Sequence, residues 1–233
     1  MSEQSKKPTI VFAHGAWCDA SVWAKVLMPF AHEGYPVRAV QLPLESYEGD
    51  VAALNLLLDE TESPVLLVGH SYAGAVISNA GNHEKVKALA YVTALAPEDG
   101  EIFGSITTMH PAESQLAITP DSRGFLWLDA DFAAKGLGHD LDRGVINLLV
   151  VSQKPTSASL FGASLTGPAW NNKPSSYLVT TDDKILAPET QYALAKRIRA
   201  HVEEVAASHL VPISQPEAVT QFIRNSLGAL EGS

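Results

Sequence analysis

Residues 65–74 read Val65-Leu66-Leu67-Val68-Gly69-His70-Ser71-Tyr72-Ala73-Gly74. The apolar start predicts a buried strand, and the small residues that follow predict a sharp turn into a helix with Ser71 at the bend. This arrangement is typical of a nucleophile elbow, in which the bend strains the serine backbone and exposes its Oγ at the C-terminal edge of a sheet. The usual pattern is G-x-S-x-G. Here Ala73 takes the last small position, which still meets the steric requirement.

A second strand-to-turn motif lies upstream, at residues 9–17, where an apolar strand ends in His14-Gly15-Ala16. A serine hydrolase with such an elbow forms its oxyanion hole from two backbone N–H groups. One belongs to the residue after the nucleophile and the other to the loop after an early strand. The predicted donors are therefore Tyr72 and Ala16. Gly15 would let the backbone approach the substrate, and His14 would brace the loop through hydrogen bonds.

Two further predicted strands are each followed by a residue of suitable chemistry. Residues 176–181 precede Asp182 and Asp183, and residues 202–206 precede His209. A serine hydroxyl is a weak nucleophile, so His209 is predicted to take its proton. A carboxylate would then fix the imidazole tautomer and stabilise the imidazolium. On these grounds either aspartate can supply that carboxylate.

With these motifs the chain resembles the α/β-hydrolase superfamily, in particular the group of plant methylesterases, α-hydroxynitrile lyases and their bacterial relatives. The resemblance implies an α/β-hydrolase fold without a cofactor and a triad of Ser71, His209 and an aspartate. The family pattern places that acid just before a short apolar turn and a proline, which favours Asp183 over Asp182. The matching segments are residues 14–17, the elbow, residues 94–97, residues 183–191, and Ser208-His209 with the following helix.

The same resemblance separates esterases from lyases. Hydroxynitrile lyases of this fold carry a threonine after the first-loop histidine and a lysine directly after the catalytic histidine. This chain has Gly15 and Leu210 at those positions. A leaving cyanide would lack its electrostatic partner beside His209, so the sequence favours an esterase.

Strands and helices alternate along most of the chain, and continuous apolar strands predict a parallel sheet buried on both faces. The sequence predicts about six parallel strands flanked by helices, with a capping box at Ser214-Gln215-Pro216-Glu217 opening the last helix. Between residues 98 and 172 the alternation fails, which predicts a cap inserted into a core of residues 1–97 and 173–233. The expected strands are 9–13, 36–42, 65–68, 86–93, 176–181 and 202–206, and the expected early helices are 20–32 and 48–60.

A cap in this position would cover the serine, exclude water and shape the substrate pocket. Trp127 is the predicted substrate-binding residue, and Phe125 and Phe132 are further candidates. An equally good interpretation is that these aromatic residues form the small core of the cap itself.

Composition narrows the function classes. The formal net charge is −10, which argues against nucleic acid and against anionic membranes as partners. The chain has no P-loop, no G-x-G-x-x-G and no H-E-x-x-H or C-x-x-C, so we expect neither cofactor nor metal. The start of the chain lacks the apolar region of a signal peptide, and Cys18 is the single cysteine, which fits a cytoplasmic protein. The oligomeric state is not predicted.

The sequence as a whole therefore predicts a serine-dependent carboxylic ester hydrolase acting on small-molecule esters. Two alternatives stay open. One is another reaction on the same residues, such as lactone or C–C bond hydrolysis or hydroxynitrile cleavage. The other is a ligand-binding receptor with slow turnover, since some proteins of this fold serve mainly as hormone receptors.

Overall fold

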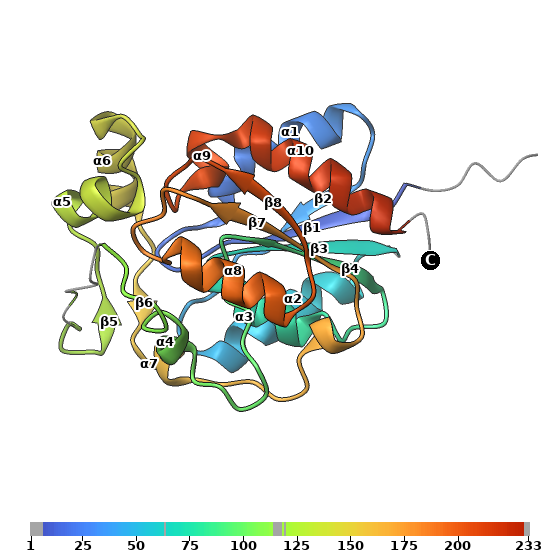
Figure 1. The fold of residues 1–233 in the computed structure, drawn as a ribbon, viewed down its shortest axis with the longest axis horizontal. Helices are drawn as coiled ribbons and strands as arrows, with labels where there is room; N and C mark the ends of the chain where they lie inside the picture. The colour runs from blue at the N-terminus through green and yellow to red at the C-terminus, as the bar shows by residue number, and fades with distance from the viewer. Residues whose placement is uncertain (1–6, 63, 114–117, 119, 231–233) are drawn as a thin grey trace, which may run out of the picture.

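The architecture follows from six parallel strands that form one sheet in the order β2-β1-β3-β4-β7-β8 (Figure 1). The structure is a computed structural model that describes residues 7–62, 64–113, 118 and 120–230. Most of the start of the chain, where the sequence lacks the apolar region of a signal peptide, lies outside the described residues. The predicted set of about six parallel strands is confirmed. The strands are β1 (Thr9–Ala13), β2 (Val37–Ala39), β3 (Val65–His70), β4 (Val86–Val92), β7 (Ser175–Thr180) and β8 (His201–Val205).

The central strands are buried on both faces because helices cover both sides of the sheet. On β1, Ile10 and Phe12 pack into one hydrophobic cluster, whereas Val11 and Ala13 pack into another on the opposite face. The first cluster contains α1 and α10, and the second contains α2, α3 and α8 (Figure 1). The helices and 3₁₀ turns around the sheet are η1 (Ala20–Trp23), α1 (Ala24–His32), α2 (Tyr47–Asp59), α3 (Ala73–Ala80), α8 (Pro188–Arg197), α9 (Val211–Ser214), α10 (Pro216–Leu227) and η4 (Gly228–Leu230).

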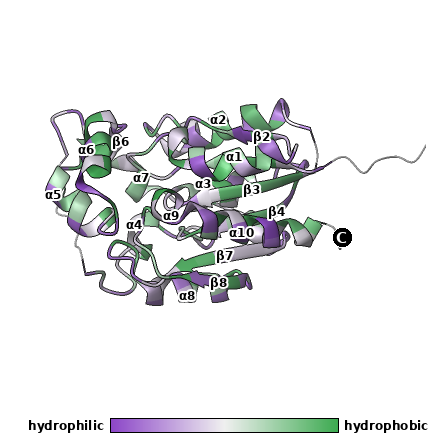
Figure 2. Ribbon diagram, turned by 90° about the horizontal axis from the view of Figure 1, so that it is seen from above, coloured by the Kyte–Doolittle hydropathy of each residue, from purple (hydrophilic) through white to green (hydrophobic). Residues whose placement is uncertain are grey.

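The two edge strands differ most from the sequence prediction. β2 covers Val37–Ala39, whereas residues 36–42 were expected, because the chain turns inward after Val40 and bonds to the loop that follows β1. β8 is largely polar and half-exposed, and Figure 2 shows it in purple beside the green β7. Continuous apolar character therefore describes the central strands but not this edge.

The capping-box prediction for the last helix is wrong. Ser214 ends α9, and the N-cap of α10 is Gln215, whose side chain makes no capping hydrogen bond. Pro216 occupies the first helical position, where its missing N–H costs nothing. The short helix α9 uses the serine that the sequence pattern had assigned to the cap.

The described residues of the segment 98–172 form short elements joined by loops. Part of the segment, including α5, α6 and the antiparallel pair of β5 and β6, lies beyond one end of the sheet, at the left in Figure 1. None of the helices in the described part of the chain combines the length and apolar character needed to span a bilayer. The elements of this segment are α4 (Phe103–Ile106), β5 (Phe125–Leu126), α5 (Ala130–Phe132), a π-helix η2 (Ala133–Leu137), α6 (Arg143–Ser152), β6 (Thr156–Ser157), α7 (Ser159–Gly162) and η3 (Ala169–Asn171).

Candidate active site

The site begins at the end of β3, where the strand breaks into α3. Ser71 has a φ of 55°, so its backbone is in the left-handed region, and the predicted strain at the bend is confirmed. The small residues around it are required by packing. A Cβ on Gly74 would lie 2.0 Å from the carbonyl oxygen of Leu95, and a Cβ on Gly69 would lie 3.0 Å from that of Ala73. The elbow therefore tolerates alanine at position 73 but needs glycine on either side of the turn.

A hydrogen-bonded chain joins three of the predicted residues, which come from the ends of three strands. The Ser71 Oγ lies 2.7 Å from Nε2 of His209, and Nδ1 of His209 lies 2.6 Å from Oδ2 of Asp183. Nδ1–H donates to the carboxylate, which leaves Nε2 to accept from the serine hydroxyl. Both His209 and Asp183 are buried.

The carboxylate of Asp183 is held by several donors. Its Oδ1 accepts the backbone N–H groups of Ile185 and Leu186 at 2.8 and 2.9 Å. Its Oδ2 accepts the hydroxyl of Thr93 at 2.6 Å, in addition to His209. Burial by itself would raise the pKa of Asp183, but His209 and these hydrogen bonds hold that pKa below its usual value. The carboxylate thus stays ionised next to the imidazole.

The other candidate acid lies outside this chain of hydrogen bonds. Asp182 is exposed, and its carbonyl oxygen accepts a hydrogen bond from Nε2 of His139 at 2.8 Å. Its carboxylate is 3.4 Å from the hydroxyl of Thr181. Of the two aspartates that follow β7, the structure brings Asp183 to His209.

Sequence reasoning missed the side chains that surround this carboxylate. Thr180 and Gln191 approach Oδ2 at 3.1 and 3.2 Å, beside Thr93. Thr93 and Thr180 directly follow or end the strands β4 and β7, so both sit at the sheet edge that carries the site. For the two threonines, the available signal was a polar residue at the C-terminal end of a buried strand. No comparable signal in the sequence marks Gln191, which lies on α8.

The predicted oxyanion loop lies against the elbow. The hypothetical Cβ of Gly15 would be 2.9 Å from the Cβ of Ser71, so the glycine allows a close approach that no other residue permits. His14 accepts the N–H of Leu42 at Nε2 (3.0 Å) and donates from Nδ1 to the carbonyl of Gly15 (2.9 Å). Burial lowers the pKa of His14 to about 4, so its ring is neutral at pH 7.

The two candidate donors are free to bind a ligand atom. Within the described residues the backbone N–H groups of Ala16 and Tyr72 have no hydrogen-bond partner. Tyr72 is the N-cap of α3, so its N–H belongs to the positive end of that helix. Trp17, the next residue after Ala16, is anchored instead through its N–H to the hydroxyl of Thr156 at 2.9 Å.

Comparison with known proteins identifies the family of this chain. The sequence profile described as the Alpha/beta hydrolase family matches residues 10–222. The chain belongs to this family. The predicted family is thereby confirmed.

Two relatives and one solved structure are similar to this α/β-hydrolase. Alpha/beta hydrolase nvfD of Aspergillus novofumigatus (strain IBT 16806) is 26% identical over 245 residues, covering 95% of this chain and 97% of that protein. The carbendazim hydrolyzing esterase of Nocardioides sp. (strain SG-4G) is 35% identical over 101 residues, covering 38% and 40%. The crystal structure of polyneuridine aldehyde esterase superposes with a TM-score of 0.82 over 94% of this chain and 99% of that chain. At 19% identity, the last likeness shows the fold.

A narrow cavity leads to Ser71 in this α/β-hydrolase. Its water-accessible volume is about 40 Å³. Within the described residues no Lys, Arg, Asp or Glu side chain lines it. Its apolar walls come from Trp17, Leu95, Leu137, Phe161, Ile185 and Leu210.

That Trp127 binds substrate stays a prediction, and the structure places this residue at the surface. Trp127 does not line the described part of the cavity; its ring is 43% exposed, and Nε1 donates to Oδ2 of Asp121 at 3.1 Å. Phe132 packs in a small cluster with Leu137 and Leu210 instead, which agrees with the alternative that cap aromatics form a local core. The aromatic residues that do line the cavity include Phe161.

The segment 98–172 is also bonded to the loop that carries His209. The N–H of Leu210 donates to the carbonyl of Leu137 at 3.1 Å, and the N–H of Ser208 donates to Oδ2 of Asp140 at 3.0 Å. The residues on either side of His209 are therefore fixed by the end of the π-helix η2 and the turn after it. In the described part of the chain, no group of three or more His, Cys, Asp or Glu side chains is placed to hold a metal ion.

His70 packs behind the elbow, as the sequence suggested. It is buried, and its Nε2–H donates to the carbonyl oxygen of His209 at 2.8 Å. Burial, with the nearby His209, lowers the pKa of His70 to about 3. The imidazole of His70 is therefore neutral. Its role is to hold the backbone of His209 in place, not to transfer a proton.

This buried histidine makes stability depend on pH. Between its ordinary value of 6.5 and about 3, the unfolded chain protonates position 70 while the folded chain does not. The free energy of unfolding should therefore fall as the pH drops below 6.5, by up to about 1.4 kcal/mol per pH unit for this group. Urea unfolding of the wild type and of His70→Asn at pH 7 and pH 5 measures the effect. We expect a smaller difference between the two pH values in the variant.

His32→Asn, at an exposed position on α1, is the matched control because it removes a histidine that the fold does not bury. It should show the same pH difference as the wild type. An unchanged pH difference in His70→Asn would contradict the assignment of a buried neutral imidazole. The pKa of His14 is also lowered, to about 4. His14 therefore adds equally to the pH dependence of the unfolding free energy in the wild type and in His70→Asn, and the difference between them still reports position 70.

Proposed function

We propose that the protein is a carboxylic ester hydrolase that acts on small, uncharged esters through a Ser71-His209-Asp183 triad and an acyl-enzyme. The observation that carries the proposal is the continuous hydrogen-bonded chain from Ser71 Oγ through His209 to Asp183, at the mouth of an apolar cavity. Two relatives are named as esterases, which supports the same reaction class.

In the first half-reaction, Ser71 Oγ would attack the ester carbonyl carbon while Nε2 of His209 takes the hydroxyl proton. The carbonyl oxygen becomes an oxyanion, which the N–H groups of Ala16 and Tyr72 would bind. When the tetrahedral intermediate collapses, the C–O bond to the alcohol breaks and His209 returns the proton to the departing oxygen. In the second half-reaction a water oxygen would attack the acyl carbon while Nε2 of His209 takes a water proton. The bond from the acyl carbon to Ser71 Oγ then breaks, His209 returns the proton to Oγ, and the acid is released.

The cavity supports ester hydrolysis over cyanohydrin cleavage. Leu210, the residue after His209, is buried and contributes an apolar wall. No cation lines the described part of the cavity to receive a leaving cyanide. The same lining disfavours substrates that carry a charge near the ester, since a buried ion without a partner costs several kcal/mol.

The direct test combines labelling with a substrate series. A fluorophosphonate should phosphonylate Ser71, and mass spectrometry of peptides locates the adduct. Turnover of p-nitrophenyl acetate, butyrate and octanoate should fall with chain length because the cavity is narrow. Labelling of another residue, or turnover of none of the three esters, would count against the proposal. Slow single turnover with tight ligand binding would instead favour a receptor.

The close approach of Gly15 to the elbow gives a further prediction. In Gly15→Ala the new methyl group would meet the Cβ of Ser71 at 2.9 Å and Nδ1 of His70 at 3.0 Å. The loop must move away, which displaces the Ala16 N–H from the oxyanion, and a misplacement of about 1 Å costs on the order of 100-fold in rate. We expect kcat/KM for p-nitrophenyl acetate to fall by about that factor.

Gly144→Ala serves as the control because a Cβ at this helical position meets nothing within 4 Å. It should keep wild-type activity and unfold at an equal or slightly higher temperature. If Gly15→Ala matched this behaviour, the loop after β1 would have no part in binding the oxyanion.

A further inference from the structure

The first turn of α2 contains a buried carboxylate that the triad does not use. Asp50 is fully buried; its Oδ1 accepts the N–H of Leu44 at 2.7 Å, and its Oδ2 accepts the hydroxyl of Tyr72 at 2.8 Å. Burial raises the pKa of Asp50, while these two bonds and the charge of Lys154 act in the opposite direction. Burying a carboxylate costs free energy, which its hydrogen bonds must offset. One of the two hydrogen bonds of Asp50 comes from Tyr72, the residue after the nucleophile.

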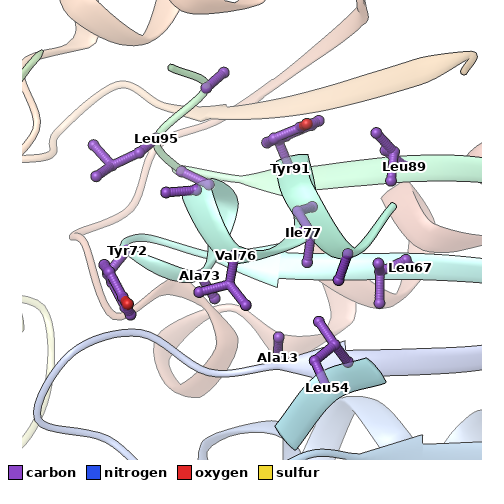
Figure 3. Packing of buried hydrophobic residues seen from close by; sticks show 14 of the residues in the cluster. Ala13, Leu54, Leu67, Tyr72, Ala73, Val76, Ile77, Leu89, Tyr91 and Leu95 are labelled. Atoms are coloured by element: carbon purple, nitrogen blue, oxygen red, sulfur yellow. The ribbon is translucent and has the colours of Figure 1, made fainter. Parts of the chain in front are cut away.

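The backbone and the side chain of Tyr72 have different roles. Its backbone N–H is a candidate oxyanion donor, and its side chain runs away from the elbow into the cluster shared with α2. Figure 3 shows Tyr72 at the start of α3, next to Ala73 and Val76. Tyr72 is buried, and its hydroxyl is hydrogen-bonded to Asp50. The side chain therefore holds the backbone of Tyr72, including its N–H, in a fixed position.

The other oxyanion loop is attached to the same place. His14 holds the carbonyl of Gly15 through Nδ1–H and accepts the N–H of Leu42 at Nε2. Leu42 and Leu44 belong to one loop after β2, in which Leu44 has a φ of 62°. Lys154 donates to the carbonyl of Leu42, which fixes this loop further.

A single hydrogen-bond network therefore links the two candidate oxyanion donors. It runs from Gly15 through His14 to the loop at residues 42–44, and from there through Asp50 to Tyr72. The two N–H groups come from different loops, and they must lie within about 2.7–3.1 Å of one oxygen to stabilise it. The hydrogen-bond network that connects the two loops therefore contributes to the spacing of the two N–H groups.

We propose that Asp50 is a positioning residue for the oxyanion hole, holding Tyr72 and the loop at residues 42–44 in register so that the N–H groups of Ala16 and Tyr72 converge on one oxygen. This inference rests on the proposed ester hydrolysis. It predicts that hydrogen-bonding geometry at position 50 matters more than charge.

Three variants separate this role from ordinary stabilisation. Asp50→Ala removes both bonds, whereas Asp50→Asn keeps an acceptor for Leu44 and lets its amide donate to the Tyr72 hydroxyl. Tyr72→Phe removes one hydroxyl and changes nothing in the backbone. Tyr47→Phe is the matched control. It removes a buried hydroxyl from α2, the helix that carries Asp50, and this hydroxyl donates to the carbonyl of Ala75 at 3.2 Å.

The measurements are kcat and KM for p-nitrophenyl acetate, the inhibition constant of a trifluoromethyl ketone, and the thermal unfolding midpoint. The ketone adds to Ser71 and places an oxyanion in the hole, so its affinity reports the donors directly. We expect kcat to fall about 10- to 100-fold in Asp50→Ala and about tenfold in Tyr72→Phe, with KM changed less than about threefold. Ketone affinity should fall by the same factor as kcat/KM. Asp50→Asn should recover most of the loss.

Tyr47→Phe should lower the unfolding midpoint and leave kcat unchanged. If Asp50→Ala does not fold, Tyr72→Phe decides the question alone. Wild-type kcat and ketone affinity in Tyr72→Phe would overturn the positioning role while the ester hydrolase stands. An inactive wild type, by contrast, would overturn the proposed function itself.

Discussion

Ser71→Ala is expected to remove nearly all ester hydrolysis and to leave the fold intact. The hydroxyl that would attack the carbonyl is the oxygen that lies 2.7 Å from Nε2 of His209, and alanine deletes only that atom. Loss of the nucleophile in a serine hydrolase costs on the order of 10⁴-fold or more in kcat, because only the oxyanion hole and substrate binding remain. The measurement is hydrolysis of p-nitrophenyl acetate, with thermal unfolding to verify the fold.

Ser78→Ala is the matched control for this variant. Ser78 is a buried serine on the helix after the elbow, and its hydroxyl donates to the carbonyl of Gly74 at 2.7 Å, away from the cavity. The control should lose stability and keep its turnover. Wild-type turnover in Ser71→Ala would show that the proposed nucleophile is wrong, and the hydrogen-bonded chain would then need another explanation.

The parts of the site that could be predicted are those with local signals. Ser71, Gly15 and Asp183 each follow an apolar strand that the sequence shows plainly, whereas His209 follows the more polar edge strand β8. Parallel strands bring the carboxyl ends of all four to one edge of the sheet. The elbow also depends on steric limits that the small residues beside Ser71 reveal. Strand order did not have to be known for these four positions to be assigned to the same edge.

Asp50 shows why other parts of the site escaped prediction. It lies in the first turn of an amphipathic helix, where an acidic residue reads as a solvated side chain favoured by the helix dipole. Its burial depends on Leu44 and on Tyr72, which is 22 positions away along the chain. The donors around Asp183 have the same character, since Thr93 approaches it across 90 positions. Such contacts leave no periodic trace in the sequence.

The segment at residues 98–172 was hard to interpret for another reason. Its elements are short, so neither a 2.0 nor a 3.6 periodicity develops, and packing alone decides which aromatic residue faces the cavity. From the sequence, Trp127 is a candidate for the cavity wall and equally for the small core of the cap. The structure instead turns it to the surface beside Asp121 and places Phe161 against Trp17 at the cavity wall, with ring centroids 6.1 Å apart.

Asp183→Asn is expected to lower kcat by on the order of 1,000-fold or more while the protein stays folded. An asparagine can keep its oxygen toward the N–H groups of Ile185 and Leu186, which places its NH₂ group where Oδ2 now accepts from His209. The ring of His209 must then accept at Nδ1 and carry its proton on Nε2. In that tautomer Nε2 has no lone pair for the proton of Ser71, so the base is lost although the geometry survives.

Asp182→Asn makes the same chemical change one residue earlier and is therefore the decisive control. The carboxylate of Asp182 is exposed, and the hydrogen bond from His139 goes to the backbone carbonyl oxygen of Asp182, which asparagine retains. Its kcat should stay within about twofold of wild type, as for most surface substitutions. The measurement is kcat for p-nitrophenyl acetate in both variants, together with their unfolding midpoints. The opposite ranking would transfer the role of the acid to Asp182, which would require the loop after β7 to rearrange during turnover so that a surface carboxylate reaches His209.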